Sequence, residues 1–265
     1  MNDRLIERYE STVKELDFFD MNVWLDPFDR ERFYPAPDFA GTVSQLRKKG
    51  IRRMLITSSE CIMYDAKTGN DHLERLIAEY DGVYGCLFLT PDPYMTETDL
   101  IGYMKEKKAR GFIAARMSPR AYNHSLKSYS CGKIYNALSE TATPLILVHS
   151  ETSWDAVHAL CSQYPKLNII IEGSGDTKLI YHNHDYLALL QTHPNLYIES
   201  RFAVLYGEIE SIVTHIGPDK LIFGTRFPYH NPAVPMSRVC FAEISDRDKK
   251  RIAHGNLEKL CGVAT

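Results

Sequence analysis

The sequence lacks the features that mark membrane proteins and nucleic-acid-binding proteins. No apolar run approaches the about 18 residues of a membrane-spanning helix, and the first residues, 1–4, carry an acid and no apolar signal core. The formal net charge is −3 and the pI is about 6.4, so no long basic field exists that could hold a phosphate backbone. We therefore expect a cytoplasmic protein whose partners include neither a membrane nor a nucleic acid.

Cysteine pairs and glycine-rich phosphate loops are also missing. The six cysteines are scattered, with no Cys-x-x-Cys pair and no short disulfide spacing, which indicates buried, reduced thiols in a cytoplasm. No Gly-x-Gly-x-x-Gly motif follows an apolar strand, so the sequence offers no signature of a dinucleotide-binding fold.

What is present is a regular alternation of short apolar runs with stretches of helical period. The 265 residues contain 44% hydrophobic and 25% charged residues, which suits one globular domain over 1–265. Eight runs predict strands, and the pattern therefore predicts an α/β fold, a single (β/α)8 TIM barrel, with a helical extension over 1–16. A doubly wound open sheet is the alternative. The expected strands are 17–24, 51–57, 83–89, 111–116, 144–149, 168–172, 195–200 and 220–224.

Several helices and loops can be placed from local signals. Gly50 follows an expected helix over 38–49, residues 71–80 carry leucines and isoleucine at helical spacing, and Ser245 caps a late helix. The segments 25–37 and 117–130 are longer than usual loops and rich in Pro, Tyr, Ser and Asn. We expect these two segments to be lids.

Polar side chains stand at or just beyond the carboxyl ends of most expected strands. These ends and their loops form the open face of a (β/α)8 barrel, where its reacting groups lie. Buried charges persist only when they are paired or used, so this rim predicts either a salt-bridge network or a site for a charged ligand. The residues are Asn22, Trp24, Glu60, Arg116, His149, Glu172, Glu199, Arg201 and Arg226.

Three of these regions resemble a known family. Residues 221–228 (Leu-Ile-Phe-Gly-Thr-Arg-Phe-Pro) run from an apolar strand into a turn, 20–24 (Asp-Met-Asn-Val-Trp) lie in the first strand, and His149 ends the fifth. Together they resemble the metal-dependent hydrolases of the amidohydrolase superfamily, in particular the amidohydrolase 2 branch, which includes decarboxylases and lactone hydrolases. The resemblance covers Asp17 to about Val263 and implies a TIM barrel. Segments 217–220 and 255–260 also look like the family.

The resemblance implies that most of the family's metal ligands are replaced in this chain. The family binds metal through two histidines of the first strand, one of the fifth, one after the sixth, and the aspartate of a Gly-Ser-Asp-x-Pro turn. Among these positions only His149 keeps a metal-binding side chain, whereas zinc needs three or four ligands. We therefore expect no metal and no other cofactor. The replacements are Asn22, Trp24, Gly173 and Arg226.

The candidate catalytic groups are His149, Glu172, Glu199 and Arg226. A histidine or a carboxylate can move a proton, and a guanidinium offers a fixed fork of donors to a carboxylate or a developing negative charge. Alternatively, Arg226 fills the metal position and pairs with Glu172 or Glu199 in a purely structural role. If the alignment has slipped, a metal binds through His149 and the two glutamates instead.

The remaining rim residues are candidates for substrate binding: Asn22, Trp24, Glu60, Arg116 and Arg201. The indole of Trp24 would fill much of the metal pocket, where it either forms a flat wall for a planar ligand or plugs the barrel. The histidines at 182 and 184 lie in a stretch of helical pattern, in which side chains two apart face different directions. We expect these two at the surface.

Two classes of function fit this sequence. The first is a metal-independent hydrolase of a lactone or ester, acting on a small carboxylated substrate, with decarboxylation as the next choice. The second is a non-catalytic relative that keeps a ligand pocket. The sequence leaves the oligomeric state open, a homo-oligomer included.

Overall fold

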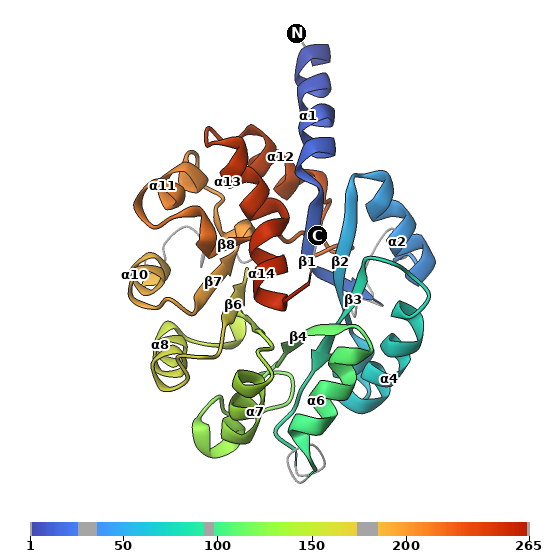
Figure 1. Ribbon diagram of the computed structural model, residues 1–265, viewed down its shortest axis with the longest axis vertical. Coiled ribbons are helices and arrows are strands. Elements are labelled where there is room, and N and C mark those ends of the chain that lie inside the picture. The colour runs from blue at the N-terminus through green and yellow to red at the C-terminus, as the bar shows by residue number, and fades with distance from the viewer. Residues whose placement is uncertain (1, 26–35, 93–97, 174–184, 264–265) are drawn as a thin grey trace.

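The computed structural model describes residues 2–25, 36–92, 98–173 and 185–263. Eight parallel strands pair in chain order around a barrel, with helices between and outside them (Figure 1). The predicted (β/α)8 fold is confirmed. The strands are β1 (Phe18–Leu25), β2 (Ile51–Ser58), β3 (Val83–Phe88), β4 (Phe112–Arg116), β5 (Leu145–Val148), β6 (Ile169–Glu172), β7 (Leu196–Glu199) and β8 (Leu221–Ile222).

The first and last strands meet through backbone hydrogen bonds beyond the short β8. The amide of Met21 donates to the carbonyl of Phe223 at 3.0 Å, and that of Trp24 donates to Phe227 at 2.8 Å. Val23 and Phe227 form a parallel bridge. The turn after β8 therefore continues the wall of the barrel and brings its side chains beside those of β1.

Several helices begin where a short polar side chain accepts a backbone amide. Asp38, Asp65, Ser153 and Ser245 each cap a helix in this way, and none of the helices in the described ranges is long and apolar enough to cross a membrane. The longer helices are α1 (Asn2–Leu16), α2 (Phe39–Lys48), α4 (Ala66–Ile77), α6 (Leu100–Ala109), α7 (Ser128–Glu140), α8 (Trp154–Gln163), α10 (Asp185–Thr192), α11 (Glu208–His215) and α12 (Ala233–Phe241). The shorter helical segments are α3 (Glu60–Met63), η1 (His149–Glu151), η2 (Ser200–Phe202), η3 (Pro218–Lys220), α13 (Asp246–Lys250), the π-helical η4 (Arg251–Gly255) and α14 (Asn256–Cys261).

The predicted boundaries need a few corrections. The helix expected over 71–80 begins at Ala66 because Asp65 caps it, accepting the amide of Thr68 at 2.7 Å. His149 does not end β5; it opens η1. In the loop after β4, where a lid over 117–130 remains a prediction, Ser118 donates to Glu151 at 2.6 Å. Most of the other expected lid, 25–37, lies outside the described residues, as do the histidines at 182 and 184.

The interior of the barrel has an apolar layer at the amino ends of the strands. Phe19, Leu55, Ile146 and Ile170 pack there with residues of α14, which lies across the barrel (Figure 1). Leu257 of α14 is 1% exposed. Because α14 closes this end, a ligand that reaches the barrel interior must enter from the carboxyl ends of the strands.

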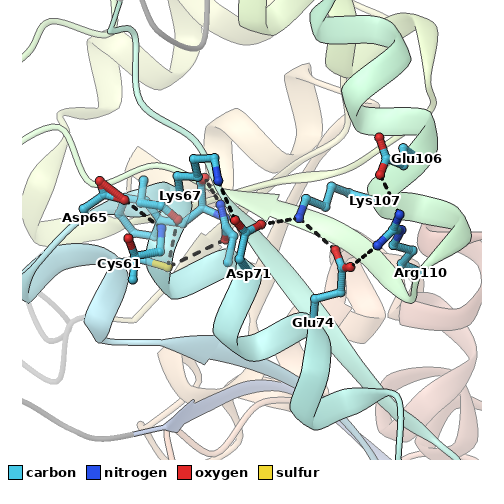
Figure 2. A network of polar contacts seen from close by, with 12 residues as sticks. Cys61, Asp65, Lys67, Asp71, Glu74, Glu106, Lys107 and Arg110 are labelled. Atoms are coloured by element: carbon cyan, nitrogen blue, oxygen red, sulfur yellow. Dashed lines mark hydrogen bonds and ion pairs between the residues drawn. The ribbon is translucent and has the colours of Figure 1, made fainter.

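Outside the barrel, an ion-pair network joins α4 to α6 (Figure 2). The Lys107 ammonium donates to Asp71 at 2.7 Å and to Glu74 at 2.8 Å, although its side chain is only 7% exposed. Arg110 pairs with Glu74 and with Glu106. Burial alone would lower the pKa of Lys107, but the hydrogen bonds with Asp71 and Glu74 raise it above its ordinary value. The network therefore keeps a buried cation charged and fixes two neighbouring helices.

Replacing Lys107 by methionine should lower the free energy of unfolding by about 2 kcal/mol, because the buried side of Glu74 loses a charged donor. The matched control is Lys67→Met, which removes an exposed partner of the same Asp71 and should cost at most about 0.5 kcal/mol. Urea denaturation of both variants checks the difference. Equal losses of unfolding free energy in the two variants would show that burial of the Lys107 ammonium does not affect stability.

Candidate functional site

Most of the predicted site residues meet in one polar layer. It lies nearer the carboxyl ends of the strands than the apolar layer that packs against α14. Contacts link them in a chain across the barrel, from β1 to β4, β6, β7 and the turn after β8. We call this group the rim cluster; its members are Asn22, Trp24, Arg116, Glu172, Glu199, Arg201 and Arg226. Strands that are far apart in the sequence thus place their last side chains together, as their parallel pairing requires.

Glu172 lies between two arginines and has no exposed surface. Arg116, itself 1% exposed, donates to one carboxylate oxygen, and Nε of Arg226 lies 3.7 Å from the other. Burial alone would raise the pKa of Glu172, but the positive charges of Arg116 and Arg226 outweigh it and hold the pKa below its ordinary value. Glu172 is therefore a carboxylate anion that neutralises guanidinium charge rather than a proton donor.

Glu199 has the opposite electrostatic balance. Its carboxylate accepts Nδ2 of Asn22 and the amide of Gly173, both at 2.9 Å, and lies 3.5 Å from Arg201. Complete burial, aided by the charge of Glu172, nevertheless raises its pKa above the ordinary value. Glu199 is thus the member of the pair better suited to hold a proton.

A glycine makes room for Glu199. A Cβ on Gly224, in the turn after β8, would lie 2.3 Å from Oε1 of Glu199, closer than any two such atoms approach. Because Gly224 has no side chain, the Glu199 carboxylate can lie against the turn after β8. The next residue but one, Arg226, has a φ of 57°, a left-handed conformation that disfavours side chains other than glycine.

The Trp24 side chain is packed within the rim cluster and does not present an exposed ring face. Its indole N–H donates to Oδ1 of Asn22 at 3.0 Å, and the Arg116 guanidinium lies 4.8 Å from its ring centroid. The side chain is 4% exposed. One face of the indole is therefore covered by the Arg116 guanidinium, which joins β1 to β4 within the rim cluster.

His149 borders the rim cluster within a group of aromatic rings. It follows Val148, whose register partner is Glu172. Its ring centroid lies 4.7 Å from that of Trp154 and 5.5 Å from that of Phe202, the residue after Arg201. The imidazole is 5% exposed. The rings of Trp154 and Phe202 therefore hold the imidazole in a buried position next to the strand end that carries Glu172.

Glu60 lies apart from the rim cluster. It is the first residue of α3, after β2. Its carboxylate is hydrogen-bonded to Nδ1 of His72 on α4 at 2.9 Å. Both side chains are about one-third exposed or more. The sequence placed Glu60 correctly beyond the second strand, but the helical turn of α3 directs its side chain to the outer helix.

Two polar residues that were not among the predicted site residues support the cluster from below. Asp20 is fully buried and accepts the amides of Asn22 and Thr225, each at 2.9 Å, and also the hydroxyl of Thr225. Burial raises the pKa of Asp20 to about 7, even though these hydrogen bonds act in the opposite direction. Asp20 thereby ties β1 to the turn that carries Arg226. The sequence signal for Asp20 was a charged residue within a mostly apolar strand.

Comparison with known proteins identifies the fold family. The model of the amidohydrolase family Amidohydro_2 matches residues 23–263. The chain belongs to this amidohydrolase family. Among the curated proteins, none matches this sequence.

Solved structures resemble this amidohydrolase over nearly its whole length. A putative amidohydrolase from Staphylococcus aureus has a TM-score of 0.68 and 16% identity, covering 92% of this chain and 99% of its own. The 5-carboxyvanillate decarboxylase of Novosphingobium aromaticivorans, complexed with manganese and a nitrobenzoic acid, has a TM-score of 0.68, 15% identity and coverage of 94% and 97%. An uncharacterised TIM-barrel protein from Bordetella bronchiseptica scores 0.67, with 15% identity and coverage of 98% and 92%. At these identities the likeness establishes the fold alone.

The described side chains of the rim cluster do not form a ready site for a divalent metal ion. Among the described residues, no three His, Cys, Asp or Glu side chains lie close enough together to hold a metal ion. Asn22 directs its amide N–H at Glu199 and accepts from Trp24 through its oxygen. Arg116 and Arg226 place fixed positive charge beside Glu172. This charge would repel a metal cation.

Proposed function

We propose that this amidohydrolase opens lactones or esters of small carboxylated substrates at the rim cluster, without a metal ion. One observation carries the proposal: Arg226 has 20% of its side chain exposed, while the other charged members of the rim cluster are nearly or fully buried. The buried network holds Arg226 from one side, and the exposed part of its side chain can meet a ligand. Its left-handed backbone conformation adds support, because strained residues concentrate at functional sites.

The chain supplies groups for each part of such a reaction. His149 takes a proton from water, and the resulting hydroxide attacks the carbonyl carbon of the ester. Arg226 donates to the oxyanion that forms. The tetrahedral intermediate then breaks its carbon–oxygen ester bond, and the leaving alcohol takes the proton from His149. The products are a carboxylic acid and an alcohol.

The other rim residues serve this step by position and charge. Arg201, 9% exposed, is the next most accessible guanidinium and would hold the substrate's own carboxylate. Arg116 is too deeply buried for that role and keeps Glu172 ionised behind Arg226. Glu199 with its raised pKa is the alternative proton carrier.

A non-catalytic ligand-binding role is the second candidate. The observation in its favour is that Glu172 and Glu199 are both fully buried and already bonded to Arg116, Arg226, Asn22 and Arg201, as in a purely structural network. A binder of this kind would keep Arg226 and Arg201 as an anion site and would not use His149.

The test is an assay of a panel of lactones, esters and aromatic carboxylates with the purified protein, with and without a chelator. We expect hydrolysis that the chelator does not change, and a fall in kcat/KM of about 10²–10⁴-fold in His149→Gln. Turnover that the chelator abolishes and zinc or manganese restores would contradict metal independence. Release of CO₂ instead of ring opening would make the protein a decarboxylase, and ligand binding with no turnover would make it a binder.

A further inference from the structure

A concavity lies at the opposite end of the barrel from the rim cluster. It has a volume of about 550 Å³ and is enclosed by α1, the end of α2 and the start of β2. Figure 1 shows α1 and the beginning of β2 at the same edge of the barrel. Gly50, with a φ of 92°, makes the junction possible, because a Cβ there would lie 2.3 Å from Val13 of α1. The close seat of α1 thus forms one wall of the concavity.

The lining of this concavity is strongly basic. Two acids, Glu10 and Asp17, also line it, but the Asp17 carboxylate is held by Arg53 at 3.0 Å and by Arg52 at 4.0 Å. A local excess of positive charge therefore forms on a protein whose formal net charge is −3. The basic residues come from three elements: Lys14, Arg47, Lys48, Lys49 and Arg52.

The lysines of this lining have no acidic partner. In the described ranges, no carboxylate forms an ion pair with the ammonium of Lys14, Lys48 or Lys49. Cations in the last turn of α2 complement its helix dipole, which accounts for Lys48. The dipole does not account for Lys14 of α1 or Arg52 of β2, which come from other elements to the same concavity. Apart from the pairing of Arg52 with Asp17, no ion pair in the described ranges offsets their mutual repulsion, and an anion that enters would relieve it.

We propose that this concavity is a binding site for a small molecule that carries phosphate groups. Phosphate presents several acceptor oxygens and about two negative charges, which match converging ammonium and guanidinium donors. The volume lies within the range of roughly 300–1,000 Å³ found for small-molecule sites, so the occupant is larger than a lone ion. The site is separate from the rim cluster and does not depend on the function proposed there.

The test titrates the full-length protein with pyrophosphate by calorimetry at low ionic strength. We expect saturable binding of one pyrophosphate per chain. The double variant Lys14→Gln/Lys49→Gln should bind at least about tenfold more weakly, since two charge-assisted contacts are lost. The matched control is Lys105→Gln/Lys166→Gln, which removes the same charge from exposed positions elsewhere and should bind as the unaltered protein does.

Two results would overturn the proposal. One is the absence of saturable binding by the unaltered protein at millimolar pyrophosphate. The other is an equal loss of affinity in the pocket variant and the control, which would mean that pyrophosphate responds only to net charge. Because the altered lysines are exposed and unpaired, neither variant should unfold, and a thermal melt confirms this.

Discussion

Replacing Arg116 by methionine should lower the free energy of unfolding by about 3–5 kcal/mol near neutral pH. Methionine is similar in length, so the main effect is the loss of charge rather than a cavity. The Glu172 carboxylate would remain fully buried, with Nε of Arg226 at 3.7 Å as its remaining ion-pair partner among the described residues. Urea denaturation measures the loss as a shift of the midpoint at unchanged slope.

The control for this prediction is the double variant Arg116→Met/Glu172→Gln. Removing both charges takes away the stranded anion, and replacing a buried ion pair by neutral side chains is often nearly neutral for stability. We therefore expect the double variant to recover most of the lost stability. If it is as unstable as Arg116→Met alone, packing around Arg116 and not its charge holds the barrel together.

The loss in Arg116→Met should also depend on pH. In the unaltered protein the pKa of Glu172 is lowered, so its contribution to stability is present above the ordinary pKa and is lost as pH falls through the lowered value. Without Arg116, burial dominates and the folded pKa rises above the unfolded one, so the variant loses stability as pH rises. The difference between the two proteins should therefore be larger at about pH 8 than at about pH 5.

Replacing Arg226 by glycine should reduce kcat/KM for lactones or esters by about 10²–10³-fold, because the oxyanion loses its charged donor. Stability should change by no more than about 1 kcal/mol. Arg116 still neutralises Glu172, and glycine adopts the left-handed backbone at this position, with a φ of 57°, without the strain that arginine has. Steady-state kinetics and urea denaturation of the same preparation give both quantities.

Arg226→Lys separates charge from geometry. It keeps a cation at this position but loses the planar fork of donors, so an intermediate activity is expected. A large fall in stability in Arg226→Gly, with ligand binding unchanged, would mean that Arg226 serves only to balance Glu172. The same result would remove the support for catalysis at the rim cluster.

The eight strands could be predicted because each is a run of apolar residues that are consecutive in the sequence. The run Ile169–Glu172 is apolar until its last residue, and its glutamate marks the carboxyl end of the strand. The same rule placed Arg116 and Glu199 correctly at the ends of β4 and β7. Strand ends converge in a parallel barrel, so the neighbourhood of these three residues followed from the fold class.

Other features of the site could not be predicted from local pattern. Glu60 stands beyond a strand like the others, yet α3 turns it toward His72. Arg116 and Arg201 are equivalent in the sequence pattern, but Arg116 is 1% exposed and bonded to Glu172, while Arg201 lies beside Glu199. These differences depend on side-chain direction over a few ångströms.

The sequence by itself determined that this protein is a (β/α)8 barrel with acids and arginines at the carboxyl ends of its strands, because hydrophobic period and strand-end polarity are properties of neighbouring residues. Only the tertiary structure decided which acid pairs with which arginine. Irregular pairing between Asp20 and Val23 of β1, together with the missing side chain of Gly224, sets the distances across the barrel. Those distances make Glu172 an anion, give Glu199 a raised pKa and leave 20% of the Arg226 side chain exposed.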